Sequence, residues 1–200
     1  MTAARSMARR SWYRGCGDRA AGPMWAAALS LLMTFAAAGA APVDANLTSF
    51  TLYFNNDGLN TDARDCAAVF PVTRTVPRTA AVATTALRGL FAGPTPDERQ
   101  AGYYSFFSSA TAGLLKRVRI ASGTAYVDLN DPRDLLSGAT SSCGAAQLRT
   151  QLDRTLRQFP SVERVRYAID GDPRAFYEWL NEPCAAANDH CDPRPFHPHR

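Results

Sequence analysis

The carboxylates that could do chemistry in this 200-residue chain are concentrated in residues 128–134. Asp128, Asp131 and Asp134 follow one another at intervals of three residues, and paired carboxylates can hydrolyse a glycosidic bond by acid and base catalysis. The segment lacks the glycine that a calcium loop places at its sixth position, so its spacing does not favour a metal site. Because the other acidic residues are scattered over predicted loops and helix ends, no catalytic pair stands out. A cell-wall hydrolase using these loop carboxylates is an alternative prediction.

A second group of reactive side chains lies near the C-terminus. Cys184, His190, Cys191, His197 and His199 could ligate zinc or copper, but their spacing fits no standard zinc pattern. The chain has no other histidine, so the preceding body lacks the usual residue of general acid–base catalysis. It also lacks an HExxH motif, a P-loop and a GxGxxG motif. We therefore expect no enzyme, no catalytic residue, no cofactor and no metal, with a metal-binding tail as a further alternative.

Residues 1–40 have the pattern of a secretory signal peptide. Arginines precede the apolar run Met24–Ala38, and the small residues Ala38-Gly39-Ala40 predict cleavage after Ala40. The alternatives are an uncleaved membrane anchor, or a later start of translation at Met7 or Met24. The apolar run is shorter than the roughly 20 residues of a comfortable span, so we expect no membrane span after cleavage.

The balance of charge restricts the partners of the body. The leader holds 5 of the 22 basic and 1 of the 18 acidic residues, so the rest of the chain carries 17 of each. A neutral body predicts binding neither to nucleic acid nor to an anionic membrane. The composition, rich in arginine and alanine with Lys116 as the sole lysine, is typical of a GC-rich bacterial genome. We expect a bacterial protein that is secreted or periplasmic.

Four cysteines remain once Cys16 leaves with the leader, and an even number suits an oxidising compartment. Four cysteines allow three pairings. We favour Cys66–Cys143, which ties an early loop to the start of a predicted helix, and Cys184–Cys191, which closes a short segment of the tail.

Two strands are predicted near the start of the body, after a linker over residues 41–48. The alternating aromatic segment 50–54 predicts the first strand. The β-branched segment 72–76 predicts the second, and its flanking residues Pro71 and Pro77 favour a sheet edge. Both strands are candidate edges for pairing with another chain.

The first long helix follows these strands. Thr79 can cap it, and its apolar face runs from Val82 to Phe91. Gly93 and Pro94 stop it, after which Thr95-Pro96-Asp97-Glu98 has the pattern of a capping box that starts a short helix.

An aromatic segment and a hairpin come next, and both are candidate contact surfaces. Four aromatic residues lie in a predicted loop that either packs on the core or forms an exposed patch for a partner. The hairpin pairs residues 114–120 with 124–129 and presents two arginines on one face, either to solvent or to a phosphate or carboxylate. The predicted interaction residues are Tyr103, Tyr104, Phe106, Phe107, Arg117 and Arg119.

The last third of the chain contains a second helix over residues 143–159, with a buried stripe that includes Leu148, Leu152 and Leu156. A strand over 165–169 follows it. Asp172-Pro173 can then cap a short helix, and the tail from Pro183 is predicted to be irregular.

The ordered set of these segments resembles the GerMN domain family of sporulation and spore germination proteins. The matching segments are TLYFNN (51–56), PVTRTVP (71–77), ALRGLFAGPTPDE (86–98), GTAYVDL (123–129) and LRTQLDRTLRQFPSVERVRYAIDG (148–171). The resemblance covers about residues 49–171 and leaves 172–200 as an extension. It implies an α/β (α+β, two-layer) fold in which two long helices pack on one face of a small mixed or antiparallel sheet. The order read from the pattern, β-β-α-β-β-α-β, agrees with it.

The resemblance also implies a way of acting. Similar domains build rings in sporulation envelope complexes, and the family extends to bacteria that make no spores. Many secreted members resemble this chain in carrying a cysteine pair at the positions of Cys66 and Cys143. The leading prediction is an extracytoplasmic, non-enzymatic module that self-assembles or binds an envelope protein or peptidoglycan, with a sporulation or germination role implied by the family.

Overall fold

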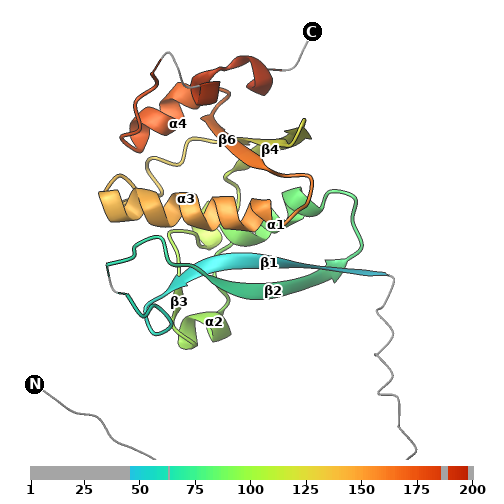
Figure 1. Ribbon diagram of the computed structural model, residues 1–200. Helices are drawn as coiled ribbons and strands as arrows, with labels where there is room; N and C mark the ends of the chain where they lie inside the picture. Colours follow the sequence, from blue (N-terminus) through green and yellow to red (C-terminus); the bar gives the residue numbers. More distant parts are fainter. Residues whose placement is uncertain (1–45, 63, 186–188, 198–200) are drawn as a thin grey trace, which may run out of the picture. The chain divides into compact units, whose positions relative to one another are not determined.

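The structure is a computed structural model that describes residues 46–62, 64–185 and 189–197 (Figure 1). The predicted signal peptide and most of the predicted linker lie outside these residues. In the part of the chain that is described, no helix is both long and apolar enough to cross a membrane.

The first sheet has three antiparallel strands in the order β2-β1-β3. Its strands are β1 (Leu47–Asn56), β2 (Phe70–Pro77) and the short β3 (Tyr103–Tyr104). Over residues 50–54 of β1 every second side chain is buried, namely Phe50, Leu52 and Phe54, as the alternation in the sequence predicts. β1 begins inside the predicted linker, because its first residues still pair with the end of β2.

The second sheet has the order β4-β5-β6, with strands β4 (Leu115–Ala121), β5 (Thr124–Leu129) and β6 (Arg164–Ile169). β4 and β5 form the predicted antiparallel hairpin. Its turn residues Ser122 and Gly123 both have positive φ, at 47° and 72°, as a two-residue turn between twisted strands favours. β6 runs parallel to β5, because the second helix returns the chain to the start of the sheet.

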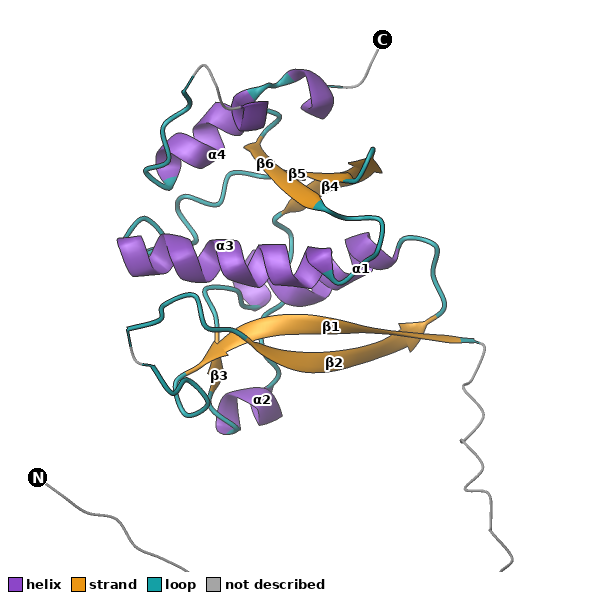
Figure 2. Cartoon of the chain, in the orientation of Figure 1, coloured by secondary structure: helices purple, strands orange, loops and turns teal. Residues whose placement is uncertain are grey.

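The two long helices, α1 (Val82–Phe91) and α3 (Ser142–Arg157), lie between the sheets (Figure 2). α1 contacts β1 and β4, and α3 contacts β1 and β6. The predicted α+β class is confirmed. The expectation of one sheet with helices on a single face is corrected to two sheets with helices between them.

The reason for this arrangement lies in the width of the buried face of α3. Leu148, Leu152 and Leu156 form the predicted apolar stripe, but Gln151 and Thr155 are also fully buried beside it. A helix that buries two adjacent stripes can pack on two surfaces at once. Pattern reasoning that follows apolar residues alone detects only one of them.

The ends of the helices follow the predicted capping chemistry in part. Gly93, with φ of +77°, follows the last turn of α1, and the capping box of Thr95 and Glu98 starts α2 (Pro96–Gln100). α1 begins later than predicted, because Ala81 rather than Thr79 occupies the N-cap and makes no side-chain cap bond. Ser141 caps α3 by accepting a hydrogen bond from the Gly144 amide at 3.0 Å.

The C-terminal extension packs on the body. α4 (Pro173–Trp179) begins at the predicted cap Asp172, and its residues Phe176 and Tyr177 join the core. The tail then forms two 3₁₀ turns, η2 (Asp189–Cys191) and η3 (Arg194–Phe196), and Phe196 is only 3% exposed. The prediction of an irregular tail is therefore corrected for these two turns.

Candidate functional site

Side chains of α3 and its C-cap cover the edge of β1 that faces away from β2. The Gln158 side chain accepts a hydrogen bond from the Thr51 amide at 2.7 Å and donates one to the Thr51 carbonyl at 2.6 Å. The Thr155 hydroxyl accepts from the Tyr53 amide at 3.3 Å. β1 is central in its sheet, and these side chains satisfy the groups that a neighbouring strand would otherwise pair. The prediction that segment 50–54 is an available edge is wrong.

Of these helix residues, the sequence pattern predicts burial of Thr155 but not of Gln151 or Gln158. Gln151, Thr155 and Gln158 recur at helical spacing, one turn after another, along a face beside the leucine stripe. Gln151 is fully buried and donates to the Asn55 side chain at 2.5 Å. A polar stripe beside an apolar one was the available signal, but such a stripe most often faces water.

The remaining edge of this sheet is β2, as predicted. The Thr51 and Tyr53 amides point away from β2, so their cross-strand partners Thr73 and Pro71 point their backbone groups away from β1. By the same alternation Pro77 lies on the outward side. Because proline has no N–H, the two bracketing prolines remove donors from the edge. β2 is an edge strand protected against pairing with another chain.

The aromatic segment after α2 mainly packs on the core. Phe107 is buried, with its ring edge-to-face against Phe91 at 4.9 Å between centroids, and Phe106 is half-buried against the same core. Tyr103 is half-buried, whereas Tyr104 is exposed over 38% of its surface. The packed-loop interpretation holds for the phenylalanines, and Tyr104 is the predicted aromatic contact that most faces solvent.

Tyr103 and Tyr104 lie beside a groove of about 670 Å³ between the end of α1, α2 and the segment that follows. We call it the α2 groove; its main lining residues are Arg74, Pro94, Arg99, Tyr103, Tyr104 and Ser108. Because Gly93 has no side chain, the end of α1 can lie directly against the backbone at Phe107. A Cβ at Gly93 would lie 2.2 Å from the Phe107 carbonyl oxygen. The end of α1 and the start of α2, which belong to the segment 86–98 that resembles the GerMN family, therefore form part of this groove.

Charged groups in and beside the α2 groove are held by fixed partners. Arg74 forms a bidentate ion pair with Glu98, in which Nη2 lies 2.7 Å from Oε2. The hydrogen bonds from Arg74 lower the pKa of Glu98. Arg99 donates to the Pro94 carbonyl. The Tyr104 hydroxyl donates to Asp57 at 2.7 Å, and burial together with this carboxylate raises the pKa of Tyr104 to about 12. The groove thus presents the protonated phenol of Tyr104 and anchored guanidinium groups at neutral pH.

Arg117 and Arg119 lie under the chain's own tail. Arg117 donates to the Phe196 carbonyl, and Arg119 donates to the Pro195 carbonyl at 2.9 Å. The Phe196 ring packs edge-to-face on Tyr126, at 5.6 Å between centroids. The expectation of a simply solvated sheet face is corrected, because η3 covers part of this face.

Two of the three predicted carboxylates, Asp128 and Asp131, have fixed partners in the fold. Asp128 is buried, accepts from the Gly171 amide at 2.7 Å and lies 3.8 Å from Arg117, so it ties the ends of β5 and β6 together. Asp131 pairs with Arg133, which lowers the pKa of the Asp131 carboxyl. Asp134 is exposed. The geometry gives Asp128 and Asp131 structural partners.

Both predicted disulfides are present, with Cα–Cα distances of 5.2 Å for Cys66–Cys143 and 5.9 Å for Cys184–Cys191. His190 lies beside the second, and ligand atoms of Cys184, His190 and Cys191 lie within 4.8 Å of one another. With both sulfurs in a disulfide, this group offers a metal only one ordinary ligand. His197 lies near Gly171, away from that cluster, and His199 lies outside the described residues.

Comparison with known proteins found a family model that matches this chain over more than half of its length. The family model described as "Germane: Sporulation and spore germination" matches residues 51–175. The chain belongs to this family. As a Germane-family member it has a GerMN-type domain, and the match reaches into α4.

Three solved structures are similar to this GerMN-type chain, each over 62% of its length. The tandem GerMN domains of GerM from Bacillus subtilis match at 19% identity and TM-score 0.43, with 40% of that structure covered. The first GerMN domain of the same protein matches at 20% identity and TM-score 0.40, with 84% covered. A putative lipoprotein from Clostridium perfringens matches at 14% identity and TM-score 0.37, with 76% covered. No curated protein matches.

Proposed function

We propose that this chain is a non-enzymatic, extracytoplasmic module that binds a protein of the cell envelope through the α2 groove. The observation that carries the proposal is the groove itself: a concave surface beside the exposed Tyr104, with Tyr103 and Arg99 in its wall. Tyrosine and arginine are enriched in protein–protein contacts because each combines a large contact area with hydrogen bonding.

The two disulfides support the proposed extracytoplasmic location. Both close within the described part of the body, and Cys66–Cys143 joins residues 77 positions apart. Such bridges form and persist in oxidising surroundings outside the cytoplasm. The leader pattern at residues 1–40 agrees with export.

The protected edges of the first sheet favour a side-chain surface over strand addition at that sheet. α3 and its C-cap cover the free edge of β1, and prolines interrupt the free edge of β2. Strand addition needs a continuous row of main-chain donors and acceptors. Self-assembly at this sheet would therefore use side-chain contacts such as those of the groove.

The test is site-specific photo-crosslinking in cells that export the full chain. A photoreactive residue at position 104 should give a discrete adduct with a second envelope protein. The same residue at Leu135, which is 48% exposed and does not line the groove, serves as the control. Adducts of equal yield from both positions, or none from position 104, would contradict the groove assignment.

Light scattering on the exported, disulfide-bonded protein separates the remaining possibilities. A discrete multimer that dissociates on Tyr104→Glu would identify a second copy as the partner. A monomer that sediments with purified peptidoglycan would move the function to wall binding.

A further inference from the structure

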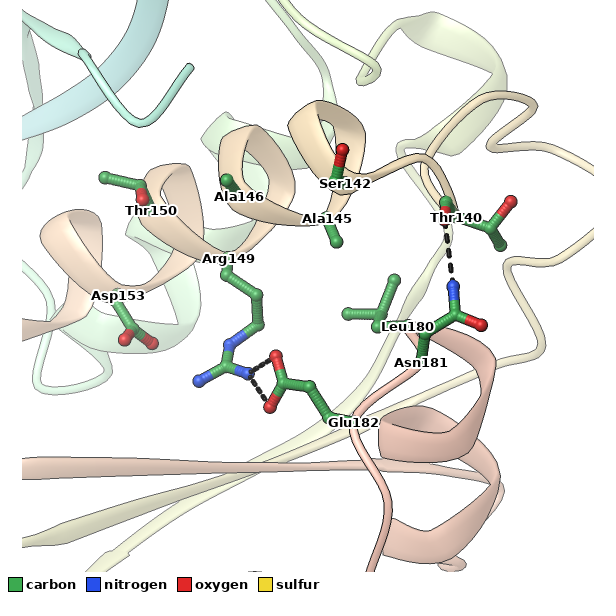
Figure 3. A pocket seen from close by; sticks show the side chains of 10 residues that line it. All are labelled: Thr140, Ser142, Ala145, Ala146, Arg149, Thr150, Asp153, Leu180, Asn181 and Glu182. Carbon is green, nitrogen blue, oxygen red and sulfur yellow. Dashed lines mark hydrogen bonds and ion pairs between the residues drawn. The ribbon is translucent and has the colours of Figure 1, made fainter. Parts of the chain in front are cut away.

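A second concave site lies between the first half of α3 and the turn that follows α4 (Figure 3). Its volume is about 620 Å³. Its main lining residues are Ser142, Ala145, Arg149, Thr150, Leu180 and Glu182. We call it the Arg149 cleft, since the Arg149 side chain points across it toward Glu182 (Figure 3).

Two tyrosine rings hold the Arg149 side chain in place. Its guanidinium carbon lies 5.6 Å from the centroids of both the Tyr167 and Tyr177 rings, a distance at which a cation is attracted to an aromatic face. The residue projects from the middle of the 16-residue helix α3, and its side chain is only 25% exposed. The cation is thus preorganised by core elements.

Glu182, the ion-pair partner of Arg149, bonds only one of the three guanidinium nitrogens. Both oxygens of Glu182 contact a single nitrogen, Nη1, at 2.6 and 2.7 Å. Arg149 Nε is buried and has no hydrogen-bond partner among the described residues. A carboxylate that approaches a guanidinium side-on bonds two nitrogens in parallel, one of them Nε, which is the stronger arrangement. Glu182 therefore leaves part of the donor set of Arg149 unused, and an incoming carboxylate reaches the buried Nε only after Glu182 and the guanidinium group have moved.

Glu182 is the replaceable member of this pair. Its side chain is 44% exposed, and it lies in the turn after α4, where Asn181 adopts a positive φ of 60°. A carboxylate that replaces Glu182 keeps the half-buried Arg149 paired, while Glu182, which is already partly exposed, regains its hydration in water. Asp153, the other acid in the cleft, already accepts from the Tyr167 hydroxyl at 2.5 Å.

The walls of the cleft fit a small residue next to a carboxylate. Ala145, Ala146 and Leu180 give short apolar surfaces, and Ser142 and Thr150 also line the cleft. We propose that the Arg149 cleft binds a short peptide that ends in a free carboxylate after an alanine-sized residue, with Glu182 as an internal competitor for Arg149. This second site is independent of the α2 groove.

Calorimetric titration of the exported protein with N-acetyl-Ala-Ala tests the proposal. The free acid should bind and the C-terminal amide should not. Glu182→Gln should raise the affinity for the acid about tenfold, because it removes the competing charge, and Arg149→Gln should lower it by about tenfold or more. The L,L and D,D forms of the probe distinguish a protein C-terminus from a wall peptide, and binding of either acid supports the site.

A matched control is available on the neighbouring helix. Glu178 pairs with Arg174 on the surface of α4, at 2.7 Å, and does not line the cleft. Glu178→Gln removes the same charge and should leave the affinity unchanged. If Arg149→Gln does not fold, the affinities of Glu182→Gln and Glu178→Gln for the acid still test the proposal, because both variants keep Arg149. Equal binding of acid and amide, or no binding of either acid to Glu182→Gln at about 10 mM, would overturn the proposal.

Discussion

Gln158 acts as a substitute for a strand residue opposite Thr51. Its side-chain amide bonds both the amide and the carbonyl of Thr51, at 2.7 and 2.6 Å. A helix thereby closes one side of β1 with the hydrogen bonds that a fourth strand would make. This contact connects the polar stripe of α3 to the protection of the sheet.

Replacing Gln158 with leucine should therefore expose a pairing edge. The substitution leaves a half-buried N–H and C=O without partners, so we expect a loss of about 1–3 kcal/mol in the free energy of unfolding. We also expect concentration-dependent association through the opened edge. Urea unfolding and light scattering measure the two effects. Arg157→Gln, one residue earlier at an exposed site, is the control and should change neither.

Gly93 should resist substitution. Gly93→Ala forces a side chain into positive φ and places its Cβ 2.2 Å from the Phe107 carbonyl oxygen, so we expect a loss of about 2 kcal/mol or more in stability. Gly113→Ala is the matched control, because a Cβ there meets nothing within 4 Å and no positive φ is involved. Thermal or urea unfolding compares the two. Equal tolerance would show that the groove wall at residues 92–96 is not fixed by this contact.

The two disulfides should differ in their contribution. On the chain-entropy estimate, a bridge across 77 positions restricts the unfolded chain by about 4.5 kcal/mol, and one across 7 positions by about 2.5 kcal/mol. Replacing both cysteines of Cys66–Cys143 with serine should thus cost about 2 kcal/mol more than the same change in Cys184–Cys191. Urea unfolding of both double variants checks the order. The reverse order would indicate that the tail contacts depend on their disulfide.

Stability should fall in acid partly through Glu98. Its pKa is lowered below the ordinary value of 4.5, chiefly by the hydrogen bond from Arg74. A carboxyl whose pKa is lower in the folded state stabilises the fold above the unfolded-state pKa, and this contribution is lost as pH falls through the folded-state pKa. Glu98→Gln should therefore be less stable than the parent at neutral pH and approach it below the range of carboxyl titration. Urea unfolding at several pH values measures this difference, with Glu178→Gln as the exposed control.

Local patterns in the sequence were sufficient for much of the fold. Alternation in 50–54 and 72–76, the stop at Gly93-Pro94, the capping box at Thr95 and the leucine stripe of α3 each depend on neighbours within a few residues. Both disulfide pairs were also expected from the sequence, although three pairings were possible. The α+β class, the family resemblance and the order of the elements other than β3, which was predicted as a loop, follow from these local signals.

Only the tertiary structure decided how the elements meet. The sequence does not show that Gln158 reaches Thr51, that η3 covers Arg117 and Arg119, or that Arg149 lies between two tyrosine rings and Glu182. Each of these contacts joins residues 18 or more positions apart, and some depend on which face of a helix a second sheet covers. Hydrophobic periodicity identifies a buried face but not its neighbour, because burial is non-directional whereas hydrogen bonds require a particular partner. The sequence by itself therefore determined the family, the class and the disulfides, and the tertiary packing decided which surfaces remain open for binding.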